Sequence, residues 1–197
     1  MTNQQYRAIG YFYANYENNL KHLSNFKKFI KNKLSFEIYG GNEENTFSHF
    51  INDFKVARNI KKGNKNKLLH LTQKWISTKS PHEVDLFAIE IKNESISKNL
   101  VTSLASKILF LNDPYKIMPL DTRVKKSICC KSNLYSDFLP MVIQVRSNKK
   151  FRECCSYITK FAEQVEKDYS NDLEKIIIIR ENRMLDLFLW ANNGEIY

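Results

Sequence analysis

An aspartate that lies between a proline and two basic residues is the part of the sequence best suited to chemistry. Asp121 follows Pro119 by two positions, and Arg123 and Lys125 come after it. We expect Asp121 to begin a helix, because a carboxylate there accepts backbone N–H groups and the helix dipole favours its negative charge. A carboxylate held in this way could act on a bound ligand, or it could only cap the helix.

Basic residues are concentrated in two segments of the chain. The sequence has 31 Lys+Arg and 21 Asp+Glu residues, which gives a formal net charge of +10. The first segment lies between Asp53 and Glu83 and contains no acidic residue; the second runs from Arg123 to Arg152 and is interrupted only by Asp137. Two such segments predict a surface that binds nucleic acid by counterion release. The alternative is a lysine-rich surface that is only solvated.

Seven basic residues are the expected contacts to nucleic acid. They are Arg58, Lys61, Lys62, Lys107, Arg123, Lys125 and Lys126. The first segment also holds Lys55, Lys65, Lys67, Lys74 and Lys79. DNA is the expected partner, with RNA and further proteins of a complex as alternatives. A weaker alternative is a regulator whose basic surface binds an acidic protein.

Cysteines and histidines give little indication of a metal site. The cysteines form two adjacent pairs, Cys129–Cys130 and Cys154–Cys155, without CxxC spacing, and the four histidines are scattered over the first half of the chain. We therefore expect no metal and no other cofactor. A secretory signal is not apparent, and no apolar run approaches the ~18 residues of a membrane span. These features predict a cytoplasmic protein with reduced thiols and no membrane partner.

Helical periodicity of apolar residues runs through most of the chain. Stripes or helical segments are expected over residues 4–34, 47–57, 84–91, 100–111, 151–169 and 172–191. The four residues Ile176–Ile179 would also suit a buried strand, but the pattern continues beyond them as a helix. We expect an all-α fold, with a single globular domain of roughly eight helices over residues 1–197. Residues 1–40 could form an N-terminal helical lobe.

The segment Pro119-Leu120-Asp121-Thr122-Arg123-Val124 resembles the Pro-Val-Asp-Thr-His-Val segment of the helix-hairpin-helix DNA glycosylase superfamily. The preceding residues, Thr102–Lys107, resemble the helix that follows the hairpin in that family. The resemblance implies a glycosylase-like fold in which a nucleotide is extruded from the duplex. It also implies that Asp121 is catalytic, stabilising positive charge on the sugar and orienting a water molecule. The candidates for stacking on the base are Tyr11, Tyr13, Trp75 and Trp190.

Two departures from the family pattern change the expected mechanism. The family hairpin is rich in glycine, whereas this chain has Ser97-Lys98-Asn99-Leu100-Val101 there. The Schiff-base lysine of bifunctional members would fall at Thr102 or Ser103, neither of which can form an imine. We therefore predict monofunctional hydrolysis of the N-glycosidic bond of an unusual base, in repair or in defence against foreign DNA. The alternative is a non-catalytic nucleic-acid-binding module.

Several of these residues also have a purely structural explanation. Trp190 could lie in the core, and Lys107 could be an ordinary exposed lysine on a helix. Arg123 could pair with Asp121 or Asp186, and Asp186 is expected to pair with Arg180 or Arg183. Cys154 and Cys155 lie on the apolar stripe of residues 151–169, which predicts core packing for both thiols.

Overall fold

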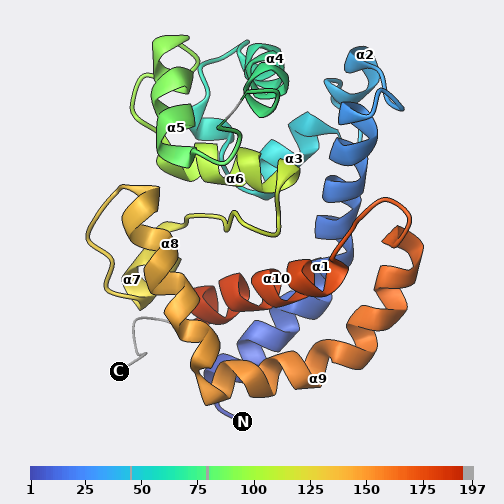
Figure 1. Ribbon diagram of the computed structural model, residues 1–197, viewed down its shortest axis with the longest axis vertical. Coiled ribbons are helices and arrows are strands. Elements are labelled where there is room, and N and C mark those ends of the chain that lie inside the picture. Colours follow the sequence, from blue (N-terminus) through green and yellow to red (C-terminus); the bar gives the residue numbers. More distant parts are fainter. Residues whose placement is uncertain (45, 79, 193–197) are drawn as a thin grey trace. The chain divides into compact units, whose positions relative to one another are not determined.

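Helices make up all the regular structure of the described residues, as the periodicity predicts. The computed structural model describes residues 1–44, 46–78 and 80–192, and Lys79 of the first basic segment lies outside them. The α-helices are α1 (Asn3–Ile30), α2 (Phe36–Tyr39), α3 (Phe47–Asp53), α4 (Lys65–Ile76), α5 (Val84–Asn93), α6 (Thr102–Asn112), α7 (Thr122–Ser127), α8 (Tyr135–Gln144), α9 (Lys149–Glu166) and α10 (Ile176–Ala191). Short 3-10 turns are η1 (Ala57–Asn59), η2 (Val145–Ser147) and η3 (Lys167–Tyr169). The all-α prediction is confirmed (Figure 1).

Packing divides the chain into two compact units. The first unit comprises residues 1–20 and 118–197, and the second comprises residues 21–117. The boundaries fall within α1 and after α6, so α1 contributes residues to both units. The domain predicted over residues 1–197 thus contains two units, and neither boundary lies at residue 40.

The second unit is built around α6. Every residue of this helix from Leu104 to Leu111 is buried, and α5 forms the most extensive helix pair with it. The helix α4 packs against both α5 and α6. Aromatic residues of α1 and α3 fill the rest of this core, including Phe26, Phe29 and Phe50.

The first unit is centred on α10. This helix packs against α9 and α7, and most of its residues from Ile179 onward are buried. Ile176–Ile179 are helical, so the helix rather than the alternative strand is correct. The helix α8 continues through Pro140; proline normally interrupts a helix, and no helix was predicted for these residues.

Four helices end in the same turn, although the chain has only 5 glycines. A non-glycine residue with positive φ follows each helix: Asn32, Lys55, Ser95 and Cys129, after α1, α3, α5 and α7. The next amide then bonds back five residues, as in Val56 N to Ile51 O (3.0 Å) and Cys130 N to Lys125 O (2.9 Å). This is the Schellman arrangement, in which the residue after the left-handed one packs inward. Cys129 and Cys130 therefore end α7, and Cys130 is buried.

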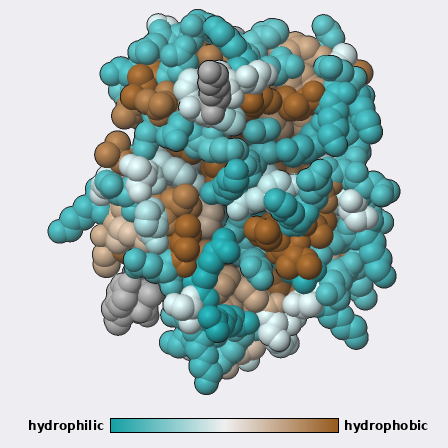
Figure 2. Space-filling view, viewed as in Figure 1, coloured by the Kyte–Doolittle hydropathy of each residue, from teal (hydrophilic) through white to brown (hydrophobic). Residues whose placement is uncertain are grey.

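The described surface is mainly hydrophilic on the face shown in Figure 2, with apolar patches between the polar side chains. Among the described residues, no helix is long and apolar enough to cross a membrane.

A buried ion pair joins α9 to α10 within the first unit. The Arg180 Nε donates to Glu166 Oε1 (2.8 Å), and the Tyr16 hydroxyl donates to the same oxygen (2.6 Å). The side chains of Arg180 and Glu166 are 8% and 6% exposed. The hydrogen bond to Glu166 raises the pKa of Arg180, and burial raises the pKa of Tyr16. The pair fixes the ends of two long helices, and breaking it leaves a charge buried without its partner.

We expect Glu166→Gln to lower the free energy of unfolding by about 3–5 kcal/mol, because Arg180 would then be buried without a counter-charge. The matched control is Glu163→Gln, which removes a carboxylate 3.8 Å from Arg180 that is 61% exposed. This control should cost less than about 1 kcal/mol. Urea denaturation measures both variants, and equal losses would contradict the assigned role of the buried pair.

Candidate nucleic-acid interface

Asp121 begins α7, as the sequence predicts. Its backbone is extended, and its Oδ1 accepts the Arg123 N–H at 2.8 Å. The side chain is half-buried, so solvent still reaches the residue. Asp121 thus accepts a backbone N–H at the start of α7 and keeps part of its surface exposed. This geometry suits a helix cap, and it also suits a carboxylate that acts on a bound ligand.

The guanidinium of Arg123 lies over an aromatic ring. Its Cζ is 4.3 Å from the centre of the Trp190 ring, and the edge of that ring packs against Tyr11 at 4.8 Å between centroids. Among the described carboxylates, none forms an ion pair with Arg123. The expected pairing with Asp121 or Asp186 is therefore not seen. Cation–π contact orients the exposed Arg123 beside the helix start that Asp121 caps.

The other predicted residues of the first unit have separate environments. The Lys125 Nζ donates to Asn133 Oδ1 at 2.6 Å, and Lys126 is exposed. Asp186 pairs with Arg183 at 2.7 Å, which confirms one of its two predicted partners. Trp190 is half-buried, between the core and surface positions expected for it.

Lys107 does not occupy the position expected of a nucleic-acid contact. It is 8% exposed, and its Nζ donates to the carbonyl of Phe54 at 3.0 Å. This carbonyl belongs to the residue that ends α3. The lysine thus stabilises a helix end inside the second unit, and its burial argues against both contact with a phosphate and an ordinary exposed position.

The connection between α5 and α6 contacts the first basic segment. The Lys61 N–H donates to Ile96 O (2.9 Å), and Asn64 Nδ2 donates to Ser95 O (3.2 Å). Lys67 also reaches Glu94, with 3.0 Å between Nζ and Oε2. The left-handed residue of this connection is Ser95. The residues that contact the lysine loop, 94–96, therefore lie just before the segment Ser97–Val101 that was compared with the family hairpin.

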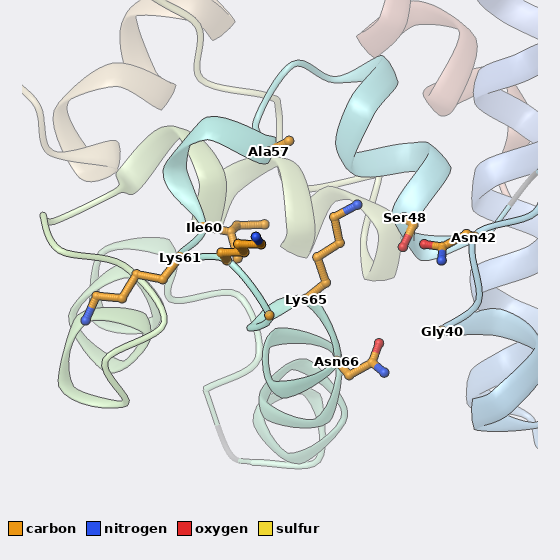
Figure 3. Close-up of a pocket in the computed structure, with 10 residues that line it drawn as sticks. Gly40, Asn42, Ser48, Ala57, Ile60, Lys61, Lys65 and Asn66 are labelled. Carbon is orange, nitrogen blue, oxygen red and sulfur yellow. The ribbon is translucent and has the colours of Figure 1, made fainter.

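A pocket of about 360 Å³ opens beside this loop (Figure 3). Its lining residues include Lys61, Lys62 and Lys65, and the others are Gly40, Asn42, Ser48, Ala57, Ile60, Gly63 and Asn66. The Lys61 side chain extends away from Lys65 and Ser48 (Figure 3). Lys65 extends from the start of α4 across the pocket towards Ser48 and Ala57 (Figure 3). Arg58 is exposed but does not line this pocket.

Polar groups in the pocket are available to a ligand. Among the described residues, no carboxylate lines the pocket or pairs with its three lysines. Ser48 is only 4% exposed, yet its hydroxyl forms no hydrogen bond with a described residue, and it faces the same space. The start of α4 adds the positive end of a helix dipole. The arrangement fits an oxyanion such as a phosphate, which accepts several charge-assisted hydrogen bonds.

Sequence reasoning identified Lys61 and Lys62 but missed Ser48 and Lys65 as parts of one site. Ser48 lies on α3, whereas the lysines lie on the loop after η1 and on α4. A serine on an apolar helix face carries no signal of its own, because only the packing of α3 against the loop exposes its hydroxyl to the lysines.

The thiols of α9 are poorly suited to chemistry. Burial raises the pKa of Cys154 to about 11 and that of Cys155 to about 12, so both remain protonated at neutral pH. A protonated thiol is a weak nucleophile and a weak metal ligand. Cys154 is fully buried, which confirms the core role predicted for it, and Cys155 is half-buried.

We expect Asp121→Ala to lower the free energy of unfolding by about 1 kcal/mol, because the Arg123 N–H loses its acceptor. Asparagine also caps helices, so Asp121→Asn should lower the free energy of unfolding by only a few tenths of a kcal/mol, roughly. Thermal denaturation of both variants measures the difference. If the two variants are equally destabilised, the cap is not what Asp121 contributes to stability.

Comparison of the chain with protein-family models, with curated proteins and with solved structures finds no match. The two candidate sites rest on their own geometry: a lysine-lined pocket in the second unit and, separately, a half-buried aspartate at the start of α7 in the first.

Proposed function

We propose that this chain binds nucleic acid and holds a backbone phosphate in the lysine-lined pocket. The observation that carries the proposal is that Lys62 and Lys65 line one pocket with the Ser48 hydroxyl, which has no hydrogen-bond partner among the described residues. Lys61 also lines the pocket, and its long side chain extends away from Ser48 (Figure 3). A phosphodiester has two non-bridging oxygens that share one negative charge, and they can accept hydrogen bonds from ammonium groups and a hydroxyl donor. The net charge of +10 supports attraction over a longer range.

We expect the triple variant Lys61→Gln/Lys62→Gln/Lys65→Gln to bind DNA roughly tenfold more weakly at moderate salt. The slope of log affinity against log salt concentration should decrease in magnitude by about 2–3, because up to three phosphate contacts would be lost. Fluorescence anisotropy with a labelled duplex, repeated at several salt concentrations, measures both quantities.

The matched control removes three exposed lysines that lie outside the pocket and outside both basic segments: Lys92, Lys160 and Lys167. Their replacement by glutamine changes the net charge equally. If this control weakens binding as much as the pocket variant, net charge rather than the pocket explains the affinity. If the unaltered chain binds neither DNA nor RNA at low salt, the proposal is wrong.

A second candidate function is base excision at Asp121. It rests on the resemblance of Pro119–Val124 to the glycosylase segment, and on the partial exposure of Asp121 beside the oriented guanidinium of Arg123. In this mechanism the carboxylate would stabilise the oxocarbenium-like sugar while a water molecule attacks. Arg123 would hold a phosphate next to the extruded nucleotide.

If Asp121 is catalytic, Asp121→Asn should lower the rate of abasic-site formation by at least roughly 100-fold while DNA binding stays unchanged. The substrates are duplexes that each carry one modified base, and alkali cleavage after incubation reveals the abasic sites. Asparagine preserves the helix cap, so a loss of activity would not reflect unfolding. If the unaltered chain leaves every duplex intact, the function is binding alone.

A further inference from the structure

Two histidines and an aspartate meet in the second unit, away from the lysines of the pocket. His22 lies on α1, whereas His49 and Asp53 lie one turn apart on α3. The His22 Nε2 is 2.8 Å from Asp53 Oδ2, and the His49 Nε2 is 3.5 Å from Asp53 Oδ1. One potential ligand atom from each residue lies within 4.8 Å of the other two. One nitrogen of each imidazole and the carboxylate of Asp53 therefore lie close together, with each histidine nearest a different carboxylate oxygen.

The spacing of these atoms suits a transition-metal ion. Zinc binds histidine nitrogen at about 2.0–2.1 Å in tetrahedral geometry, so neighbouring ligand atoms lie about 3.3 Å apart. The His22 distance to Asp53 Oδ2 and the His49 distance to Asp53 Oδ1 lie on either side of this value, and the three ligand atoms are at most 4.8 Å apart. Small rotations of the exposed side chains would then be enough to bring three ligands around one ion.

The surroundings of the three residues also fit such a site. His22 is buried and its ring packs against Phe50 and Phe54, which fixes the imidazole in an apolar environment. The side chains of His49 and Asp53 are 34% and 30% exposed, so an ion could enter from solvent and keep a water molecule in the fourth position. A rigid buried ligand with two accessible ligands is what an open three-ligand site requires.

We propose that His22, His49 and Asp53 form a binding site for a divalent transition metal of the zinc class. Nitrogen ligands favour zinc, cobalt or nickel over magnesium and calcium, which prefer sites made of oxygen atoms alone. The site is independent of the proposed binding of nucleic acid, because none of its three residues lines the lysine pocket. Sequence analysis missed it because His22 lies 31 residues from Asp53, and only the His49–Asp53 spacing of one helical turn could have been noticed.

The competing explanation is that Asp53 only forms hydrogen bonds with two histidines. The chain contains a useful comparison, because His82 pairs with Asp113 at 3.2 Å and its side chain is 39% exposed. His82 resembles His49 in exposure, although Asp113 is more buried than Asp53 (11% against 30%), and the described structure brings no second histidine to the pair. It should therefore not hold a metal ion.

The test is calorimetric titration of the full chain with zinc chloride after removal of metals by a chelator. We expect one ion per chain, an increase in melting temperature, and no binding of magnesium. His49→Ala and Asp53→Asn should each weaken zinc binding more than roughly tenfold, whereas the matched control His82→Ala should leave it unchanged. Cobalt bound to the chain should show the visible bands of a tetrahedral ion without the thiolate charge-transfer band.

Three outcomes would overturn the proposal. The first is an absence of zinc binding by the unaltered chain. The second is zinc binding that persists in the His49→Ala/Asp53→Asn double variant but is lost in Cys129→Ser, which would assign the ion to the exposed thiol. The third is an equal loss of binding in His82→Ala, which would show that the effect is not specific to this cluster.

Discussion

A residue in the left-handed conformation ends α1, α3, α5 and α7, and the direction of the chain after each of these helices depends on it. Residues other than glycine are sterically disfavoured in this conformation. Buried residues that follow the left-handed ones, such as Val56 and Ile96, stabilise these turns. The turn after α3 leads to η1 and the lysine loop. The turn after α5 presents the carbonyls of Ser95 and Ile96 to the same loop.

Several of the charged residues are used inside the fold rather than on its surface. Lys107 binds the carbonyl that ends α3, Arg180 binds Glu166, and Arg183 binds Asp186. Each buried charge has a partner, because desolvation would otherwise be costly. The cations that remain for a ligand are fewer than the composition suggests, and three lysines are among the residues that line one pocket in the second unit.

The short helix α3 contributes to two different sites. Ser48 and His49 are consecutive, so their side chains leave the helix about 100° apart. Ser48 faces the lysine pocket, whereas His49 lies next to Asp53 and the ring of His22. The Thr46 hydroxyl caps the start of this helix, and Lys55 ends it. Seven residues held between two fixed ends therefore place Ser48 at the lysine pocket and both His49 and Asp53 in the cluster with His22.

The sequence by itself determined the helical class, the start of α7 at Asp121 and the core position of Cys154, because each depends on local spacing along one helix. The continuation of α8 through Pro140 could not be predicted, since local preference opposes it and the packing of Phe138 and Val142 decides it. Only the tertiary structure decided that Lys107 is buried, that Ser48 joins the lysines and that His22 meets Asp53. These facts depend on contacts between distant segments, and the spacing of residues along the chain does not reveal which faces of its helices pack together.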